Sequence, residues 1–335
     1  MPSLTLLGPQ RFTPTLGEAV ARAGVSGRLA SVTAGWQERE AEDLELHEHL
    51  GERTENLMLY ARSEDVFERD AELERAYRER QERLRELQEI YRGRLAHALA
   101  ALREIEKRDG DPNFLRPELD SALAGMRDLD AHHLIRITSL HEEFDERLRP
   151  TDRPAVMRHA RQIERQLARA EGVAIAGGHV AILLNRLRLF DLGRKIGAKA
   201  IFAWSAGAMA IAERVIVFHH FPPQGQGITE VLEAGLGLAR GVVPLPHAHR
   251  RLALDDPERL SRVARRFAPA LCVAMSDGGC LELDASGGGS GEWRSCGGMS
   301  RILPDGRLGP MPPMPPTSPM LPRAPLAPMP AEREA

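Results

Sequence analysis

Three residues of the types that cooperate in nucleophilic catalysis each follow an apolar, strand-like run. They are Ser205 after 198–204, His247 after 242–246 and Asp277 after 271–276. A serine hydroxyl attacks a carbonyl carbon when an imidazole takes its proton and a carboxylate holds the imidazole in the right tautomer. Ligands of an open α/β sheet gather at the carboxyl ends of its strands. We therefore predict that these three side chains meet there as a catalytic group.

The turn around Ser205 has the composition of a nucleophile elbow, in which a serine projects between a strand and a helix. The stretch 201–210 reads IFAWSAGAMA, so small residues follow the serine directly. Small neighbours allow the sharp turn, and the backbone N–H groups of Ala206 and Gly178 are our candidates for binding an oxyanion. The alternative interpretation is a serine that only caps the helix N-terminus.

Five short motifs together resemble the peptidase S51 family, which groups aspartyl dipeptidase and cyanophycinase on a sheet similar to that of class I glutamine amidotransferases. The motifs are GG at 177–178, SAGA at 205–208, GLGLA at 235–239, PHAHRR at 246–251 and SDGG at 276–279. The resemblance implies Ser205 as nucleophile, His247 as general base and Asp277 as the acid. It also implies a serine hydrolase that cleaves an amide bond next to an aspartyl residue through an acyl-enzyme.

The substrate implied by this resemblance is a small peptide or another aspartyl-containing molecule, whose carboxylate needs a nearby cation. Arg250 and Arg251 stand beside His247 and are our candidates for that contact. We group His179, from the GGH turn at 177–179, with them as a substrate-binding residue.

The chain departs from the family pattern at the elbow and in its acidic residues, among other positions. Ala203 stands at the first glycine position of the elbow, and no carboxylate occurs from 214 to 229, which leaves Glu230 as a reserve for Asp277. These departures support an alternative function, a non-catalytic amidotransferase-like protein with a binding or scaffolding role.

Histidines and cysteines raise the separate question of a metal site. His219, His220, His247 and His249 could converge, but no partner stands at the usual ligand spacing. The segment HEEFD at 141–145 lacks the second histidine of a metalloprotease helix, and we interpret it as a charged helix face. Cys272, Cys280 and Cys296 also lack ligand spacing and read as reduced bystander thiols. We expect neither a metal nor a cofactor.

Composition limits the classes of partner. The 335 residues are 42% hydrophobic, which suffices for a substantial core, and the net charge of -3 gives no overall attraction to nucleic acid or anionic lipid. The start of the sequence does not read as a signal peptide, and no run of about 18 apolar residues suggests a membrane span. We expect a cytoplasmic protein that binds neither nucleic acid nor a membrane.

Strand-like and helix-like segments alternate along the sequence, and this alternation predicts an α/β fold with three layers and a mostly parallel sheet, similar to class I glutamine amidotransferases. We expect a long α-helical hairpin to interrupt this fold. We assign 1–62 to the first part of the α/β domain, 63–170 to the helical insertion, 171–308 to the remainder with the site, and 309–335 to a disordered tail rich in Pro and Met. Apolar residues spaced by three and four along the insertion predict packing or oligomerisation, with a homodimer as the expected partner.

Overall fold

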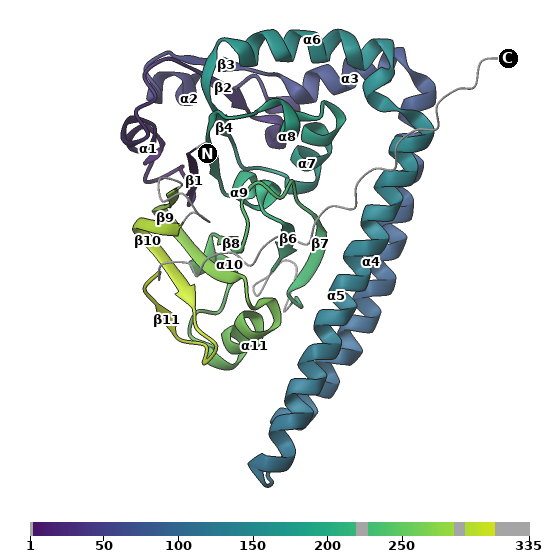
Figure 1. The fold of residues 1–335 in the computed structure, drawn as a ribbon, viewed down its shortest axis with the longest axis vertical. Helices are drawn as coiled ribbons and strands as arrows, with labels where there is room; N and C mark the ends of the chain where they lie inside the picture. The colour runs from purple at the N-terminus through teal and green to yellow at the C-terminus, as the bar shows by residue number, and fades with distance from the viewer. Residues whose placement is uncertain (1–2, 219–226, 285–291, 312–335) are drawn as a thin grey trace, which may run out of the picture.

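A computed structural model of the chain describes residues 3–218, 227–284 and 292–311 (Figure 1). Of the tail expected from 309 onward, only 309–311 fall within these ranges, and Gly309 pairs with Arg301 in a short strand. His219, His220 and the rest of the expected tail lie outside the described residues.

Nine strands of the described chain form one sheet in the order β11-β10-β9-β1-β5-β4-β2-β3, and β8 pairs with β9. The strands are β1 (Leu4–Leu7), β2 (Arg28–Val32), β3 (Thr54–Asn56), β4 (Ala170–Ile175), β5 (Ala200–Trp204), β8 (Val242–Pro246), β9 (Leu271–Asp284), β10 (Glu292–Ile302) and β11 (Leu308–Gly309). The strands from β1 to β3 in this order run parallel, whereas β9, β10 and β11 extend the sheet antiparallel. The central sheet is therefore mostly parallel, as the sequence predicted.

Helices cover both faces of this sheet. On one face, α1 (Leu16–Arg22) and α2 (Leu44–His49) share an apolar cluster with β1, β2 and β5. The other face carries α7 (Val180–Leu189), α8 (Leu192–Lys195) and α9 (Ala206–Ile211). Apolar runs such as Leu4–Leu7 are buried along their whole length because helices shield both of their faces.

Strand β9 joins two parts of the sheet that approach each other head to head. Its first half pairs in parallel with β8, ending at Pro246 opposite Met275, and its second half pairs antiparallel with β1, beginning at Leu7 opposite Cys280. Residues 276–279 between these pairs bulge out of the ladder with β10. The carboxyl ends of β1, β5 and β8 therefore meet at this bulge. The strand-like run that the sequence shows at 271–276 is therefore the first part of a longer strand.

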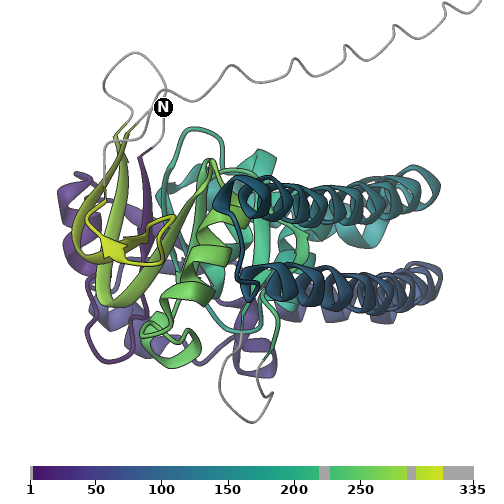
Figure 2. The ribbon, with the colours of Figure 1, turned by 90° about the horizontal axis from the view of Figure 1, so that it is seen from below.

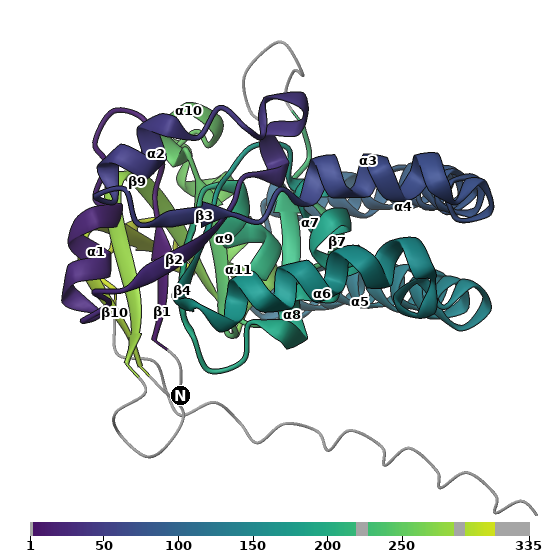
Figure 3. The ribbon, with the colours of Figure 1, turned by 90° about the horizontal axis from the view of Figure 1, so that it is seen from above.

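The helical insertion begins slightly earlier than expected, with α3 (Leu59–Arg69), and continues through α4 (Ala71–Glu106), α5 (Pro112–Leu148) and α6 (Pro154–Ala168). Helices α4 and α5 form a long antiparallel hairpin that lies beside the α/β domain and extends past it, as seen from below in Figure 2. Helices α3 and α6 contact each other, and α3 also packs against α7 and α6 against β4 (Figure 3). None of the helices within the described ranges combines the length and apolar character that a membrane crossing requires.

A strand pair and two helices remain in the described chain, besides two short 3-10 helices at Ala34–Arg39 and Pro150–Asp152. Strands β6 (Arg214–Val217) and β7 (Glu230–Ala234) form a separate antiparallel pair that contacts α5. Helices α10 (Ala248–Arg251) and α11 (Pro257–Phe267) follow β8, and α11 packs against α5. The hairpin therefore shares an apolar cluster with β6, β7, β8 and α11.

Candidate functional site

Ser205 occupies a strained turn between β5 and α9. Its backbone has φ 50° and ψ −119°, a region that residues with a side chain rarely adopt and that costs of order 1–3 kcal/mol. Although Ser205 stands at the N-cap position, its side chain makes no capping hydrogen bond. The hydroxyl is thus left for another partner, and the interpretation of Ser205 as a simple helix cap fails.

The small residues around Ser205 are required by close backbone contacts. A Cβ atom at Gly207 would lie 2.3 Å from the carbonyl oxygen of Ile175, and one at Gly177 would lie 2.9 Å from the Cβ of Ser205. Ala203, at the first glycine position of the elbow, is fully buried in β5. The glycine expected there is therefore replaceable by alanine, whereas the glycine after the serine is not.

His247 stands directly after β8, and its Nε2 lies 3.4 Å from Ser205 Oγ. At this separation the hydroxyl can donate a long hydrogen bond to the ring nitrogen, and such bonds are often loose in unliganded sites. Burial lowers the pKa of the His247 imidazole below its ordinary value of 6.5, and the charge of Arg251 lowers it further. The ring is therefore neutral near pH 7 and able to accept a proton.

The structure does not bring Asp277 into hydrogen-bond contact with His247. Asp277 lies in the bulge of β9 with an exposed side chain, and it makes no hydrogen bond to the imidazole within the described ranges. Its negative charge still reaches the ring, because it acts to raise the pKa of His247 against the effects of burial and Arg251. The acid therefore acts on His247 through its charge rather than by holding the ring.

Glu230, the alternative to Asp277 as the acid, contacts helix α4 rather than His247. Its carboxylate accepts hydrogen bonds from Gln88 and Arg92 of α4, at 2.8 Å and 2.6 Å. These contacts fasten β7 to the hairpin, so we withdraw Glu230 as a candidate for orienting His247.

The two candidate oxyanion donors, Gly178 and Ala206, lie in the turns that follow β4 and β5. Gly178 has φ 110°, and a Cβ atom there would lie 2.3 Å from the carbonyl oxygen of Gly35, so only glycine fits this turn. Ala206 is the first residue of α9, where an N–H has no partner inside the helix. Among the described residues, neither N–H group donates a backbone hydrogen bond. Both are available to an oxyanion.

The three residues expected to bind substrate, Arg250, Arg251 and His179, differ in their contacts. Arg250 is exposed, with its guanidinium carbon 5.3 Å from the centre of the Phe12 ring, and Arg251 is exposed beside it. His179 caps α7, since its Nδ1 accepts a hydrogen bond from the N–H of Ile182 at 3.3 Å. This capping contact was not foreseen from the sequence.

The segment 141–145 is in part the charged helix face that we expected, since Glu142, Glu143 and Asp145 are exposed, whereas His141 and Phe144 are buried. His141 is buried and lies 3.1 Å from the carboxylate of Glu233 on β7, and Arg188 of α7 contacts both His141 and that carboxylate. The sequence could not show that His141 has buried partners, because Glu233 and Arg188 come from two elements distant in the sequence. The contacts join α5 to the α/β domain.

The metal alternative built on histidines finds no support in the described ranges. The single metal-capable group found there does not include His247 or His249 and consists instead of Cys280, Glu282 and Cys296. Sequence spacing had not grouped these three residues, since two of them lie on one strand and the third on its neighbour.

Comparisons with known proteins add little to this description. No family model matches the chain, and a search of curated proteins found no match. Among solved structures, the chain is similar to the crystal structure of a peptidase from an acI-B1 Actinobacterium, with a TM-score of 0.45 and 13% sequence identity over 94% of this chain and 93% of that one. We base no argument on a likeness at this TM-score.

Proposed function

We propose that the protein is a serine hydrolase of the peptidase type, with Ser205 as nucleophile and His247 as general base. The observation that carries the proposal is the 3.4 Å separation of Ser205 Oγ and His247 Nε2, at a serine whose backbone has φ 50° and ψ −119°. A strained turn persists where the surrounding structure enforces it, and such turns concentrate at functional sites. A serine held in this way beside a neutral imidazole has the parts that acyl transfer needs.

The reaction would proceed through an acyl-enzyme. His247 Nε2 takes the proton of Ser205 as Oγ attacks the carbonyl carbon, and the N–H groups of Gly178 and Ala206 bind the resulting oxyanion. His247 then protonates the leaving amine, and the C–N bond breaks. A water molecule next gives a proton to His247 and attacks the acyl carbon. His247 then returns that proton to Oγ as the ester C–O bond breaks, which releases the acid and free Ser205. Asp277 supports the imidazolium by its charge.

The substrate class rests on the family resemblance described above. We propose an amide bond next to an aspartyl residue, with the substrate carboxylate bound by Arg250 or Arg251. Both guanidinium groups are exposed on the helix that follows His247. A planar guanidinium binds a carboxylate through two parallel hydrogen bonds, so an uncharged isostere should bind less well.

A non-catalytic binding or scaffolding role is the second candidate, and one observation favours it. No carboxylate of the described chain is hydrogen-bonded to His247, whereas a full triad holds its imidazole in this way. The two candidates differ in whether the Ser205 hydroxyl is reactive.

Labelling with a fluorophosphonate probe separates them. We expect the native chain to be labelled once, at Ser205, and Ser205→Ala to lose the label while keeping its circular dichroism spectrum. His247→Ala should slow labelling strongly, because the base is gone. Ser261→Ala is the matched control, since the Ser261 hydroxyl donates to the carbonyl of Pro304 away from the site, and its labelling should be unchanged. A native chain that stays unlabelled would favour the scaffolding role.

A further inference from the structure

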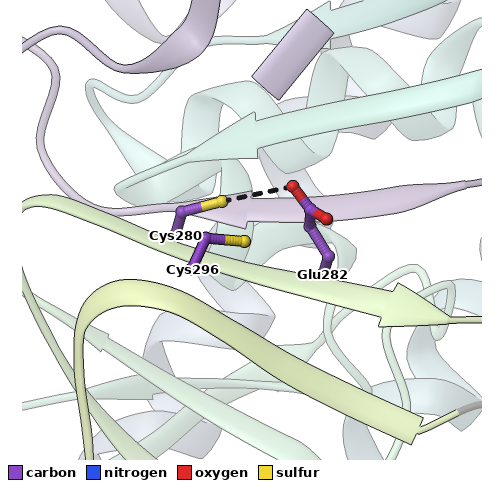
Figure 4. A group of neighbouring side chains, drawn as sticks. All are labelled: Cys280, Glu282 and Cys296. Atoms are coloured by element: carbon purple, nitrogen blue, oxygen red, sulfur yellow. Dashed lines mark hydrogen bonds between the residues drawn. The ribbon is translucent and has the colours of Figure 1, made fainter. Parts of the chain in front are cut away.

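A second cluster of reactive side chains lies near the sheet edge between β9 and β10. It consists of Cys280 and Glu282 on β9 and Cys296 on β10, and their ligand atoms all lie within 4.8 Å of one another. Figure 4 shows the two sulfur atoms next to each other, with the Glu282 carboxylate beside them. The proposed hydrolase mechanism uses none of these groups.

The strand register explains why the three side chains share one face. Cys280 and Glu282 are two residues apart on β9, so they point to the same side of the sheet. On β10, Ser295 pairs with Leu281 and Gly297 pairs with Cys280, which leaves Cys296 as an extra residue in a β-bulge. A bulge sets two residues against one on the partner strand, and here it brings Cys296 beside Cys280.

The spacing of the cluster suits a tetrahedral ion. Zinc lies about 2.3 Å from a cysteine sulfur and about 2.0–2.2 Å from a carboxylate oxygen, so a tetrahedral site sets sulfur and oxygen about 3.6 Å apart. Cys280 Sγ lies 3.6 Å from Glu282 Oε1. Cys296 is exposed, so the side of the cluster that it forms is open to water, which could fill the fourth position.

Arg22 of α1 completes the charge balance. Its Nη2 lies 3.0 Å from Cys280 Sγ and 2.8 Å from Glu282 Oε1. Two thiolates and a carboxylate around a divalent ion leave one negative charge, which the guanidinium neutralises. Groups that hydrogen-bond to metal ligands from outside commonly orient them and tune the affinity. With its side chain 40% exposed, Arg22 can also shift to admit an ion.

We propose that Cys280, Cys296 and Glu282 bind a thiophilic divalent cation of the zinc class, with Arg22 as the outer hydrogen-bond donor. On binding, each thiol gives its proton to solvent and becomes a thiolate ligand. The ion would fasten β10 to β9 directly beside the bulge at 276–279. The proposal is independent of the hydrolase function, because it involves neither Ser205 nor His247.

Cobalt titration tests the site directly. The full chain, freed of metal with a chelator and kept reduced with a phosphine, is titrated with Co²⁺, whose thiolate complexes absorb in the near ultraviolet. We expect one ion per chain, the absorption of two thiolate ligands, and displacement by Zn²⁺. Cys296→Ser should lose half of this absorption, and Arg22→Gln should weaken binding about 10- to 100-fold without changing the number of thiolates.

Two features keep the test decisive. Cys296 is exposed, so Cys296→Ser should fold normally, which circular dichroism checks. Cys272 is buried elsewhere, with its thiol near the carbonyl of Val263, so Cys272→Ala is the matched control and should bind Co²⁺ like the native chain. The proposal is overturned if the reduced native chain gives no thiolate absorption. It is equally overturned if Cys296→Ser binds and absorbs as the native chain does.

Discussion

At the scale of single residues, His247 is tuned by its surroundings. Burial contributes most to lowering the pKa of its imidazole, Arg251 and Arg250 lower it further, and Asp277 opposes them. A base with a lowered pKa is unprotonated at neutral pH and loses function only when the pH falls through that pKa. If His247 is the general base, we expect the acid limb of activity to lie below pH 6.5, the ordinary pKa of histidine.

Two substitutions should move that limb in opposite directions. Asp277→Asn removes a charge that raises the pKa of His247, so the limb should move to lower pH. Arg251→Gln removes a charge that lowers this pKa, so the limb should move to higher pH. The measurement is the pH profile of kcat/KM, or of the fluorophosphonate labelling rate if no substrate is in hand. Shifts in the same direction for both variants would contradict this electrostatic account.

The meeting of Ser205 with His247 could be predicted from sequence, because both residues directly follow buried strands. The position of Asp277 could not. It also follows an apolar run, but that run belongs to a strand that continues through a bulge, and the shape of the bulge depends on pairing with β10. The spacing of residues in the sequence does not show that β10 is the partner strand of this bulge.

At the scale of elements, the elbow depends on how closely α9 approaches β4. We expect Gly207→Ala to abolish labelling of Ser205 and to destabilise the fold, because the added Cβ atom would lie 2.3 Å from the carbonyl oxygen of Ile175. Gly125→Ala on α5 is the matched control, since no heavy atom lies within 4 Å of its added Cβ atom. That control should gain up to about 1 kcal/mol from helix propensity. Thermal unfolding and labelling check both, and an intact, reactive Gly207→Ala would refute the packing argument.

Elements with a strong apolar period were predictable, and elements defined by their partners were not. The apolar stripes on α4 and α5 and the apolar runs that form β1, β2 and β5 can be recognised in the sequence. Strands β7, β10 and β11 were missed, because partly exposed strands beside other strands carry only weak alternation. Asp191, with a φ of 49°, separates α7 from α8.

At the scale of the whole molecule, the hairpin is fastened to the domain by a buried ion pair. Asp130 of α5 accepts from Arg266 of α11 at 2.6 Å, with both side chains at most 4% exposed, and from the hydroxyl of Tyr91 on α4 at 2.8 Å. The apolar stripes of the hairpin are likewise buried inside the chain. A homodimer through the insertion stays a prediction, and it would have to use the outer face of the hairpin.

Breaking this pair should cost far more than breaking a surface pair. Asp130→Ala leaves the Arg266 charge buried without its partner, and we expect a loss of about 3–5 kcal/mol in the free energy of unfolding. Asp120→Ala removes the partner of Arg265 in a pair whose side chains are 62% and 34% exposed, and should cost at most about 1 kcal/mol. Urea unfolding monitored by circular dichroism gives both values. Equal losses would show that the hairpin is held mainly by apolar contacts.

The head-to-head arrangement of β1 and β8 against β9 has a consequence for assembly order during synthesis. Strand β5 and Ser205 have been synthesised once 205 residues have been made, but His247 follows β8 later in the sequence. Strand β8 is held in the sheet by β9, which is synthesised later still. A ribosome-bound chain stopped before β9 would contain Ser205 and His247 but would lack the strand that aligns β8 with β1. If the proposed function holds, hydrolytic activity should therefore appear only after β9 has been made and has paired with β8 and β1.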